Sequence, residues 1–169
     1  ISGSPVLLGV GRMVYYKGFQ YAIKAMRDIE ANMILVGEGE DLEKLKDKAR
    51  RLGVFERVHF AGYVPEEELS KYYEMSDVFL FPSIEPAEAF GIVQVEAMAH
   101  GVPVVNTSLP TGVPFVSKHE QTGLTVEPRS AEALRSAISR LLNDDSLRRR
   151  FSENAKKRAS KFSKRNMID

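Results

Sequence analysis

The segment VFLFPSIEPAEAFGIVQVEAMAHGVPVV, Val78–Val105, contains an apolar run, a helical pattern and a second apolar run. We expect Val78–Phe81 and Val102–Val105 to be strands, because neither run alternates with polar residues, as is typical of a parallel sheet covered on both faces. Between them a helix is predicted at Glu88–His100, and Gly101 follows it at a position typical of a helix C-cap. The segment therefore predicts one βαβ unit.

Apolar runs and helical patterns alternate in the same way along the rest of the chain. Further strands are expected at Val6–Val10, Met33–Val36, Val58–Phe60 and Leu124–Val126. Further helices are expected at Phe19–Ile29, Asp41–Leu52, Glu67–Met75, Ala131–Asn143 with Ser130 as N-cap, and about Ser146–Phe162. This alternation predicts an α/β fold: a Rossmann-like, doubly wound parallel sheet of about six strands with helices on both faces and right-handed crossovers. We expect residues 1–169 to form a single domain.

The overall composition excludes several classes of protein. Of 169 residues, 43% are hydrophobic and 28% are charged, which argues against disorder. A net charge of +1 gives no general reason to expect nucleic acid or an anionic membrane as a partner. The absence of cysteine excludes disulfides and thiolate metal sites. No apolar run approaches the roughly 20 residues that span a bilayer, and no signal peptide is visible. Because the sequence does not begin with methionine, we expect it to be part of a longer protein.

Ligands of such sheets bind beyond the carboxyl ends of the strands, so the loops at these ends are the candidate site. In the first loop, GVGRMVYYKG at residues 9–18, Gly11 closes the strand, and Arg12 and Lys17 follow. Two cations beside a helix N-terminus suit a diphosphate, because the free N–H groups there also favour anions. The alternative is a glycine turn with two solvated cations, and the loop alone leaves both readings open.

Two other loops give weaker signals. Residues 37–41, GEGED, contain two glycines but do not match GxGxxG. Glu40 and Asp41 would repel phosphate, so we expect a tight turn there. In FAGYVPEEE, residues 60–68, Gly62 would let the backbone approach a flat ligand such as a base.

The loop after Phe81 carries the most specific pattern, two carboxylates around a Phe-Gly pair. We expect Phe90 and Gly91 in the first helical turn, where backbone N–H groups without a helical partner can bind phosphate. Glu88 and Glu96 would instead accept hydrogen bonds from neighbouring hydroxyls, as a carboxylate does from a ribose diol. A sugar nucleotide fits both requirements. In the alternative reading Glu88 only complements the helix dipole and Glu96 is a surface residue, although an unpartnered charge is unusual among so many apolar neighbours.

Taken together, the loops resemble the C-terminal donor-binding domain of the family-four retaining glycosyltransferases, which have the GT-B fold. The similar segments occur in the order of the family and cover nearly the whole chain: GVGRMVYYKG, LVGEGED, VHFAGYVPEEEL, YYEMSDVFLFPS, EAFGIVQVEAMAHGVPVV and TGLTVEP. The resemblance implies an enzyme that transfers a sugar from a nucleoside diphosphate sugar to a hydroxyl acceptor, with retention at the anomeric carbon, in polysaccharide or glycolipid synthesis.

The resemblance also implies a role for each matching residue. Arg12 and Lys17 would hold the donor diphosphate, and Glu88 would contact hydroxyls of the transferred sugar; these three form the implied catalytic set. Glu96 would bind the ribose hydroxyls. The remaining implied donor-binding residues are Gly11, then Gly62, Tyr63 and Val64 beside the base, and Phe90, Gly91 and Ile92, whose amides face the sugar and the phosphates.

Two segments depart from the family pattern. The loop from Ser83 to Glu88 is longer than the commonest family form, so Glu85 has to be considered beside Glu88, although the register of the Phe-Gly pair favours Glu88. Where the family often has Gly-Gly-x-Pro-Glu, this chain has TSLPTGVPFVS at residues 107–117.

The second departure leaves the contacts of Thr111 and Gly112 undetermined. The variant resembles members that act on surface polysaccharides, including mannosyltransferases, and therefore favours a mannosyl donor.

No metal or cofactor is required by the resemblance, and His59, His100 and His119 are scattered along the chain. The family binds its hydroxyl acceptor, a saccharide or a lipid-linked molecule, in an N-terminal domain that we expect this chain to lack. We therefore expect the isolated chain to fold and to bind nucleotide weakly without transferring sugar. A cytoplasmic location is expected, with no nucleic acid as partner.

Some alternatives stay open from the sequence. The basic run RRRFSENAKKRASKFSKR, residues 148–165, fits the solvated face of an amphipathic helix over the core, and the other interpretation is peripheral membrane contact. The rival functions are a GT-B epimerase or phosphorylase relative and a non-catalytic sugar-nucleotide-binding module. A phosphorylase would be expected to carry a lysine for pyridoxal phosphate, and no motif indicates one.

Overall fold

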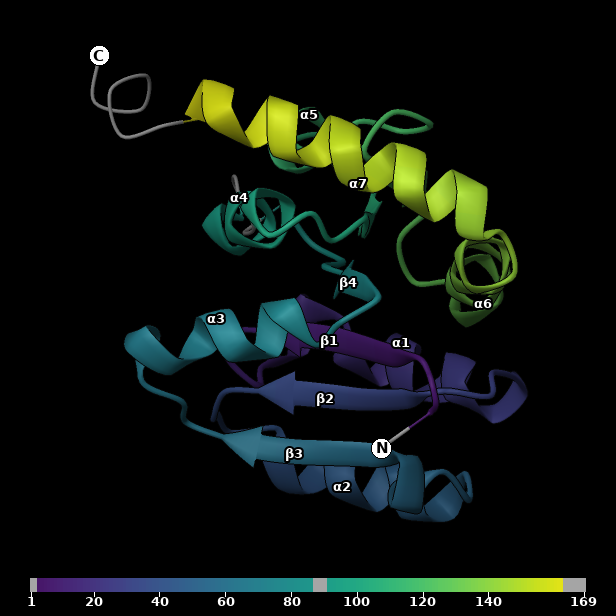
Figure 1. The fold of residues 1–169 in the computed structure, drawn as a ribbon. Coiled ribbons are helices and arrows are strands. Elements are labelled where there is room, and N and C mark those ends of the chain that lie inside the picture. Colours follow the sequence, from purple (N-terminus) through teal and green to yellow (C-terminus); the bar gives the residue numbers. More distant parts are fainter. Residues whose placement is uncertain (1–2, 87–90, 163–169) are drawn as a thin grey trace.

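The computed structural model describes residues 3–86 and 91–162, which contain a six-stranded sheet in the order β3-β2-β1-β4-β5-β6. All neighbouring strands are parallel (Figure 1). The strands are β1 (Val6–Val10), β2 (Asn32–Val36), β3 (Val58–Gly62), β4 (Val78–Phe81), β5 (Val104–Thr107) and β6 (Gly123–Val126). This order confirms the expected Rossmann-like α/β fold, in which the winding changes direction between β1 and β4.

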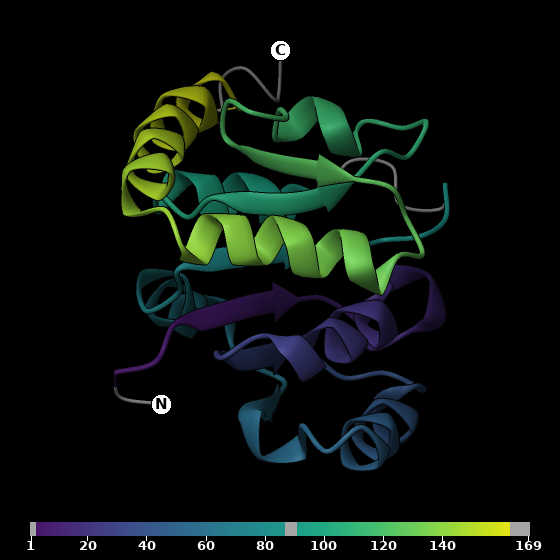
Figure 2. The same ribbon diagram turned by 90° about the vertical axis from the view of Figure 1, so that its right-hand side faces the viewer.

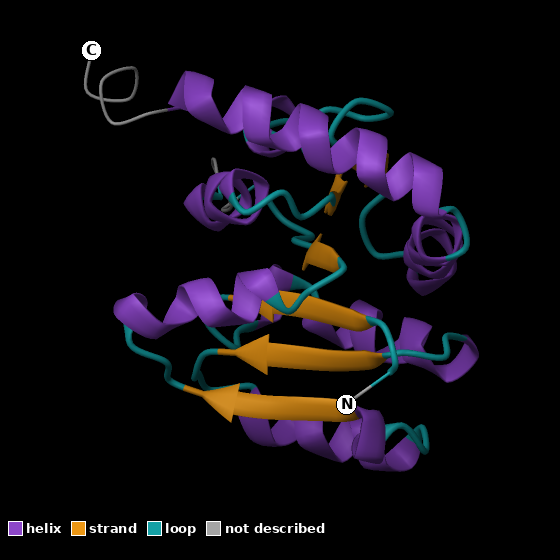
Figure 3. Cartoon of the chain, viewed as in Figure 1, coloured by secondary structure: helices purple, strands orange, loops and turns teal. Residues whose placement is uncertain are grey.

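Helices cover both faces of the sheet, so that orange strands lie between purple helices in Figure 3. They are α1 (Phe19–Ala25), α2 (Leu42–Arg51), α3 (Glu66–Glu74), α4 (Ile92–Ala99), α5 (Val113–Val116), α6 (Ala131–Leu142) and α7 (Asp145–Ala159). One face packs against α1, α2 and α6, and α1 and α6 lie side by side (Figure 2). The other face packs against α3, α4 and α5, and α7 extends from α6 to α4.

The apolar runs of the inner strands β1, β4 and β5 lack polar alternation because both faces of these strands are buried, whereas the edge strands β3 and β6 are only partly buried. Successive side chains of a strand point to opposite faces. Leu7 therefore packs on the face of α1, α2 and α6, whereas Leu8 packs on the face of α3 and α4, and both are fully buried.

Most predicted boundaries agree with the structure to within one or two residues, and the Ser130 hydroxyl caps α6 by accepting from the Ala133 N–H at 3.0 Å. Four predictions were wrong at their ends. The last helix, expected to about Phe162, ends at Ala159 and continues as a 3-10 turn, Ser160–Phe162. The first helix ends at Ala25 and continues as a 3-10 turn, Met26–Asp28. β5 begins at Val104, because Pro103 has no N–H for the ladder.

The last of these boundaries is functionally important, because α4 begins at Ile92, whereas the predicted start at Glu88 lies outside the described residues. Gly91 is the N-cap and has the left-handed backbone, with φ of 79°, so it lies before the first turn and not in it. The sequence also gave no signal for α5 or for the 3-10 turns at Tyr15–Lys17 and Phe55–Arg57.

Within the two described ranges, no helix combines the length and the apolarity that a membrane span requires. The arrowheads of β2 and β3 point to the left in Figure 1, and all strands are parallel, so the loops at their carboxyl ends gather on that side. These loops form the candidate site.

Candidate functional site

The loops that follow β1, β2 and β3 are joined to one another by backbone hydrogen bonds. The Gly11 N–H donates to the Val36 carbonyl at 2.9 Å, and the Gly37 N–H donates to the Gly62 carbonyl at 2.8 Å. A Cβ on Gly37 would lie 1.8 Å from the carbonyl oxygen of Gly11, so any larger residue would push the loops apart. The glycines thus permit a close stack of three loops at the carboxyl edge.

The GEGED segment is the tight turn that the sequence predicts. The Met13 N–H donates to the Glu38 carbonyl at 2.9 Å, and the Asp41 N–H donates to the Met13 carbonyl at 2.8 Å. A Cβ on Gly39 would lie 2.5 Å from the same Met13 oxygen. This turn therefore supports the β1–α1 loop from one side.

The loop with the two predicted cations packs directly on the loop after β4. Gly18 has a left-handed backbone with φ of 75°, and a Cβ there would lie 1.8 Å from the carbonyl oxygen of Pro82. The Ile84 N–H donates to the Tyr16 carbonyl at 2.9 Å. Because β1 and β4 flank the change of winding, these two loops meet at the position where doubly wound sheets bind ligands.

Lys17 and the N-cap of α4 lie against the same aromatic ring. The Nζ of Lys17 is 5.2 Å from the centroid of the Phe81 ring, and a Cβ on Gly91 would lie 2.6 Å from Cζ of that ring. A Cβ on Gly11 would lie 3.4 Å from Cε of Lys17, so the Lys17 side chain extends beside Gly11. Arg12 is exposed on the same loop. The structure thus brings the predicted cations to the side of the molecule where α4 begins.

A buried polar network fixes α4 and the segment after β5. The Asn106 side-chain amide donates to Oε1 of Gln94 at 2.8 Å and to the carbonyls of Val113 and Ser117, both at 3.1 Å. The Thr125 hydroxyl donates to Oδ1 of Asn106 at 2.7 Å. Asn106 therefore holds residues 107–117, the segment that departs from the family pattern, in one position beside α4.

Glu96 has a partner that the sequence did not reveal. The Tyr73 hydroxyl of α3 donates to Oε2 of Glu96 at 2.8 Å, so Glu96 is not an unpartnered charge among its apolar neighbours. Burial, and then the negative charge of Glu96, raise the pKa of Tyr73 far above its ordinary value. A helical period would have signalled Tyr73, which lies four residues after Leu69 on the buried side of α3.

The loop predicted beside a base has an open surface. Gly62 has φ of 70°, and a Cβ there would meet no heavy atom within 4 Å. Tyr63 is 71% exposed, whereas Val64 packs partly against the core. The loop is thus anchored at Val64 and presents Gly62 and Tyr63 outward.

Two side chains that the sequence did not indicate hold the loop after β4. The buried Thr107 hydroxyl donates to the Ser83 carbonyl at 2.6 Å, and the Arg129 guanidinium donates to the Ile84 carbonyl at 3.2 Å. The loop leads to Glu85, which is half-buried. Glu88 and Phe90 lie outside the described residues. The choice between Glu85 and Glu88 as the acid that contacts the sugar therefore stays a prediction.

The predicted site residues thus divide into groups. Lys17 and Gly91 lie against the Phe81 ring, Gly11 and Arg12 belong to the same loop as Lys17, and Ile92, the first residue of α4, is 46% exposed. The group of Gly62, Tyr63 and Val64 follows β3 on the same edge, and Glu96 lies along α4 toward α3.

The histidines have separate structural contacts. His59 bonds to Asn32 at 3.0 Å, the His100 ring stacks on Tyr73, and His119 Nδ1 accepts from the Thr125 N–H at 3.0 Å. In the part of the chain that the structure describes, no three His, Cys, Asp or Glu side chains form a group that could hold a metal ion.

Residues 1–158 match the family "Glycosyl transferases group 1". An uncharacterized glycosyltransferase of Methanocaldococcus jannaschii is 38% identical over 156 residues, which cover 90% of this chain and 39% of the relative. A GDP-mannose-dependent alpha-(1-6)-phosphatidylinositol monomannoside mannosyltransferase of Mycobacterium tuberculosis is 34% identical over 150 residues, 83% of this chain and 39% of the relative. The chain thus spans 39% of the length of each of these two relatives.

A similar solved structure is that of Anabaena HepE in complex with UDP-glucose. It is 28% identical, has a TM-score of 0.89, and the match covers 95% of this chain and 45% of that chain.

Proposed function

Because the chain belongs to the group 1 glycosyl transferases, we propose that it is the part of an enzyme that binds a nucleoside diphosphate sugar. The enzyme would transfer the sugar from this donor to a hydroxyl acceptor. The observation that supports this proposal most directly is the position of Lys17, whose ammonium lies against the same ring as the N-cap of α4. A cation and a helix N-terminus side by side suit a diphosphate, because both favour negative charge.

The proposed chemistry follows from the charge of the leaving group. When the bond between sugar and diphosphate breaks, negative charge develops on the departing phosphate. Lys17, Arg12 and the first-turn N–H groups of α4 would stabilise that charge without reorganising, as preorganised donors do in an oxyanion hole. The two cations would thus stabilise the transition state as well as bind the donor.

The two ends of the donor would be recognised by different elements. Glu96 would accept hydrogen bonds from the ribose hydroxyls, because a carboxylate can accept from a diol. The exposed Tyr63 and the open surface of Gly62 suit a base, which stacks readily on an aromatic ring. Glu88 would contact hydroxyls of the transferred sugar.

The finer parts of the proposal come from the family resemblance. They are retention at the anomeric carbon, a cytoplasmic role in polysaccharide or glycolipid synthesis, and a second domain that binds the acceptor. The relatives point to two donors, since the HepE complex contains UDP-glucose and the mycobacterial enzyme depends on GDP-mannose. We favour a mannosyl donor because of the 107–117 segment.

Calorimetric titration of this chain with GDP, UDP and ADP, and then with their sugar conjugates, tests the proposal. We expect one of the three diphosphates to bind more tightly than the other two, and more tightly than the monophosphate of the same nucleoside. A sugar conjugate incubated with the chain and a simple alcohol should not be consumed faster than in buffer, because the acceptor site is proposed to lie in the second domain. Equal, negligible binding of all three diphosphates would rule out a donor site.

A further inference from the structure

The contact between Tyr73 and Glu96 joins two helices at the place where the donor ribose is proposed to bind. Tyr73 is 2% exposed near the end of α3, and Glu96 is half-buried in the second turn of α4. The phenolic oxygen lies 2.8 Å from Oε2 of the carboxylate. Among the described residues, Tyr73 is the one hydrogen-bond partner of this carboxylate.

The Tyr73 ring is itself held in place by aromatic neighbours. It stacks on the His100 ring at 5.1 Å between centroids with 19° between the planes, and it contacts Phe79 at 5.8 Å. The Nδ1–H of His100 donates to the backbone carbonyl of Glu96 at 2.8 Å, so His100 links the ring to the same turn of α4. The phenolic hydroxyl therefore has little freedom to follow the carboxylate elsewhere.

This arrangement determines which oxygen of Glu96 is available to a ligand. The phenol keeps its proton, since burial and the neighbouring carboxylate both raise its pKa, and it can only donate to Glu96. Oε2 therefore carries the bond from Tyr73. Oε1 has no partner among the described residues and keeps its lone pairs for another donor.

We propose that Tyr73 is a positioning residue, which fixes the carboxylate of Glu96 so that Oε1 accepts from the ribose diol of the donor. The inference rests on the proposed function, because it needs a nucleotide in the site. Tyr73 does not touch the nucleotide and acts through the orientation of Glu96.

The test is a comparison of Tyr73→Phe with wild type in calorimetric titration, using a nucleoside diphosphate and its 2′,3′-dideoxy analogue. Phenylalanine keeps the ring and removes the hydroxyl. We expect Tyr73→Phe to weaken binding of the ribonucleotide by about tenfold, since one hydrogen bond to a charged group is lost, and to leave the dideoxy analogue unchanged. Glu96→Gln should lose the same preference for ribose, and adding Tyr73→Phe to it should have no further effect.

Tyr72→Phe is the matched control, because Tyr72 is the neighbouring residue of α3 and is partly buried against the same core. It should bind both nucleotides as wild type does. Equal weakening of both nucleotides by Tyr73→Phe, or no change in either, would refute the positioning role. If Tyr73→Phe fails to fold, an unchanged preference for ribose in Glu96→Gln refutes it as well.

The outcomes separate this inference from the proposed function. If the wild-type chain binds none of the nucleoside diphosphates, both are refuted. If it binds one of them and Lys17→Ala weakens that binding while Tyr73→Phe does not, the donor site stands and only the role of Tyr73 is refuted.

Discussion

Lys17 lies in the loop after β1 and Phe81 is the last residue of β4, and the ammonium of Lys17 is 5.2 Å from the centroid of the Phe81 ring. An ammonium near an aromatic ring is attracted by its electron-rich face. The contact brings the side chain to the carboxyl end of β4, beside the N-cap of α4. The position of this cation therefore depends on the loop after β1 and on the end of β4 together.

We predict that Lys17→Ala and Arg12→Ala each weaken binding of the nucleoside diphosphate by at least about tenfold, because a charge-assisted contact to phosphate is lost. In the enzyme with its acceptor domain, turnover should fall on the order of 10²-fold, as when a donor is removed from an oxyanion hole. Titration and steady-state kinetics measure the two effects. Arg51→Ala is the control, because Arg51 is an exposed cation at the C-terminal end of α2. It should change neither the binding nor the turnover. Normal turnover in both site variants would remove these cations from the mechanism.

Gly18 should be required for the two loops to meet. We predict that Gly18→Ala lowers the free energy of unfolding by about 3 kcal/mol, because alanine is strained at φ of 75° and its Cβ would overlap the Pro82 carbonyl. Gly53 has φ of 74° and nothing within 4 Å of a Cβ, so Gly53→Ala isolates the backbone strain and should cost about 1 kcal/mol. Urea denaturation compares the two variants. Equal losses would show that the close approach to Pro82 has no energetic weight.

The sequence predicted the fold because the signals for it are local. The apolar runs of the inner strands are buried on both faces, as at Leu7 and Leu8, so these runs indicated parallel strands without any knowledge of their partners. The boundaries failed where one residue controls the backbone. Pro103 delays β5, and the left-handed Gly91 delays α4.

The site was predictable only in part, for a related reason. Glycines and cations at strand ends, such as Gly11 and Lys17, are visible in the sequence itself. The contacts that orient the site join distant positions: 23 residues separate Tyr73 from Glu96, and 45 separate Ile84 from Arg129. Such pairs are determined by how the elements pack in space, which no short motif encodes.

Asn106 should be among the most sensitive polar residues of the fold. It is fully buried, and its amide serves Gln94 and two backbone carbonyls. We predict that Asn106→Leu lowers the free energy of unfolding by about 3 kcal/mol, because buried acceptors lose their donor. Ser108→Ala, at an exposed position next to the same strand, should change it by less than about 0.5 kcal/mol. A loss of less than about 1 kcal/mol in Asn106→Leu would mean that the network is not a determinant of stability.

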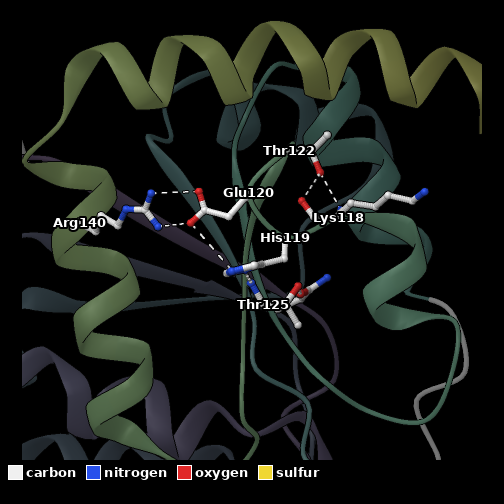
Figure 4. A network of polar contacts seen from close by, with 7 residues as sticks. Lys118, His119, Glu120, Thr122, Thr125 and Arg140 are labelled. Atoms are coloured by element: carbon white, nitrogen blue, oxygen red, sulfur yellow. Dashed lines mark hydrogen bonds and ion pairs between the residues drawn. The ribbon is translucent and has the colours of Figure 1, made fainter.

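Figure 4 shows a surface network that makes the stability of the fold depend on pH. Glu120 forms a double hydrogen bond with Arg140 of α6, in which Nη2 lies 3.0 Å from Oε2, and His119 Nε2 is 3.9 Å from Oε1. The hydrogen bond from Arg140 is the main reason that the pKa of Glu120 is lowered from its ordinary value of 4.5. The bridge links the segment before β6 to α6.

Because the folded pKa lies below the unfolded one, the stabilisation by Glu120 is present above about pH 4.5 and is lost as the pH falls through the folded pKa. We predict that Glu120→Gln lowers the thermal midpoint slightly at pH 7 and less at pH 3. The effect should be small and should shrink in high salt, since both side chains are solvent-exposed. Melting curves of wild type and Glu120→Gln at both pH values measure it. A difference that is as large at pH 3 as at pH 7 would contradict the ionic origin.

Removal of divalent metal should leave donor binding unchanged. In the proposed site, Arg12, Lys17 and the first-turn amides of α4 would together supply the positive potential that a metal ion would otherwise give to a diphosphate. We therefore expect the same dissociation constant for the nucleoside diphosphate in EDTA and in Mg²⁺ or Mn²⁺, measured by calorimetry at constant ionic strength. The same comparison in Lys17→Ala is a more sensitive test. This variant has lost one of the two cationic side chains of the proposed site, so an added metal ion would strengthen its binding more than that of the wild-type chain. If Mg²⁺ tightens binding by tenfold or more in the wild-type chain, the diphosphate is held through a metal and the two cations alone are not sufficient.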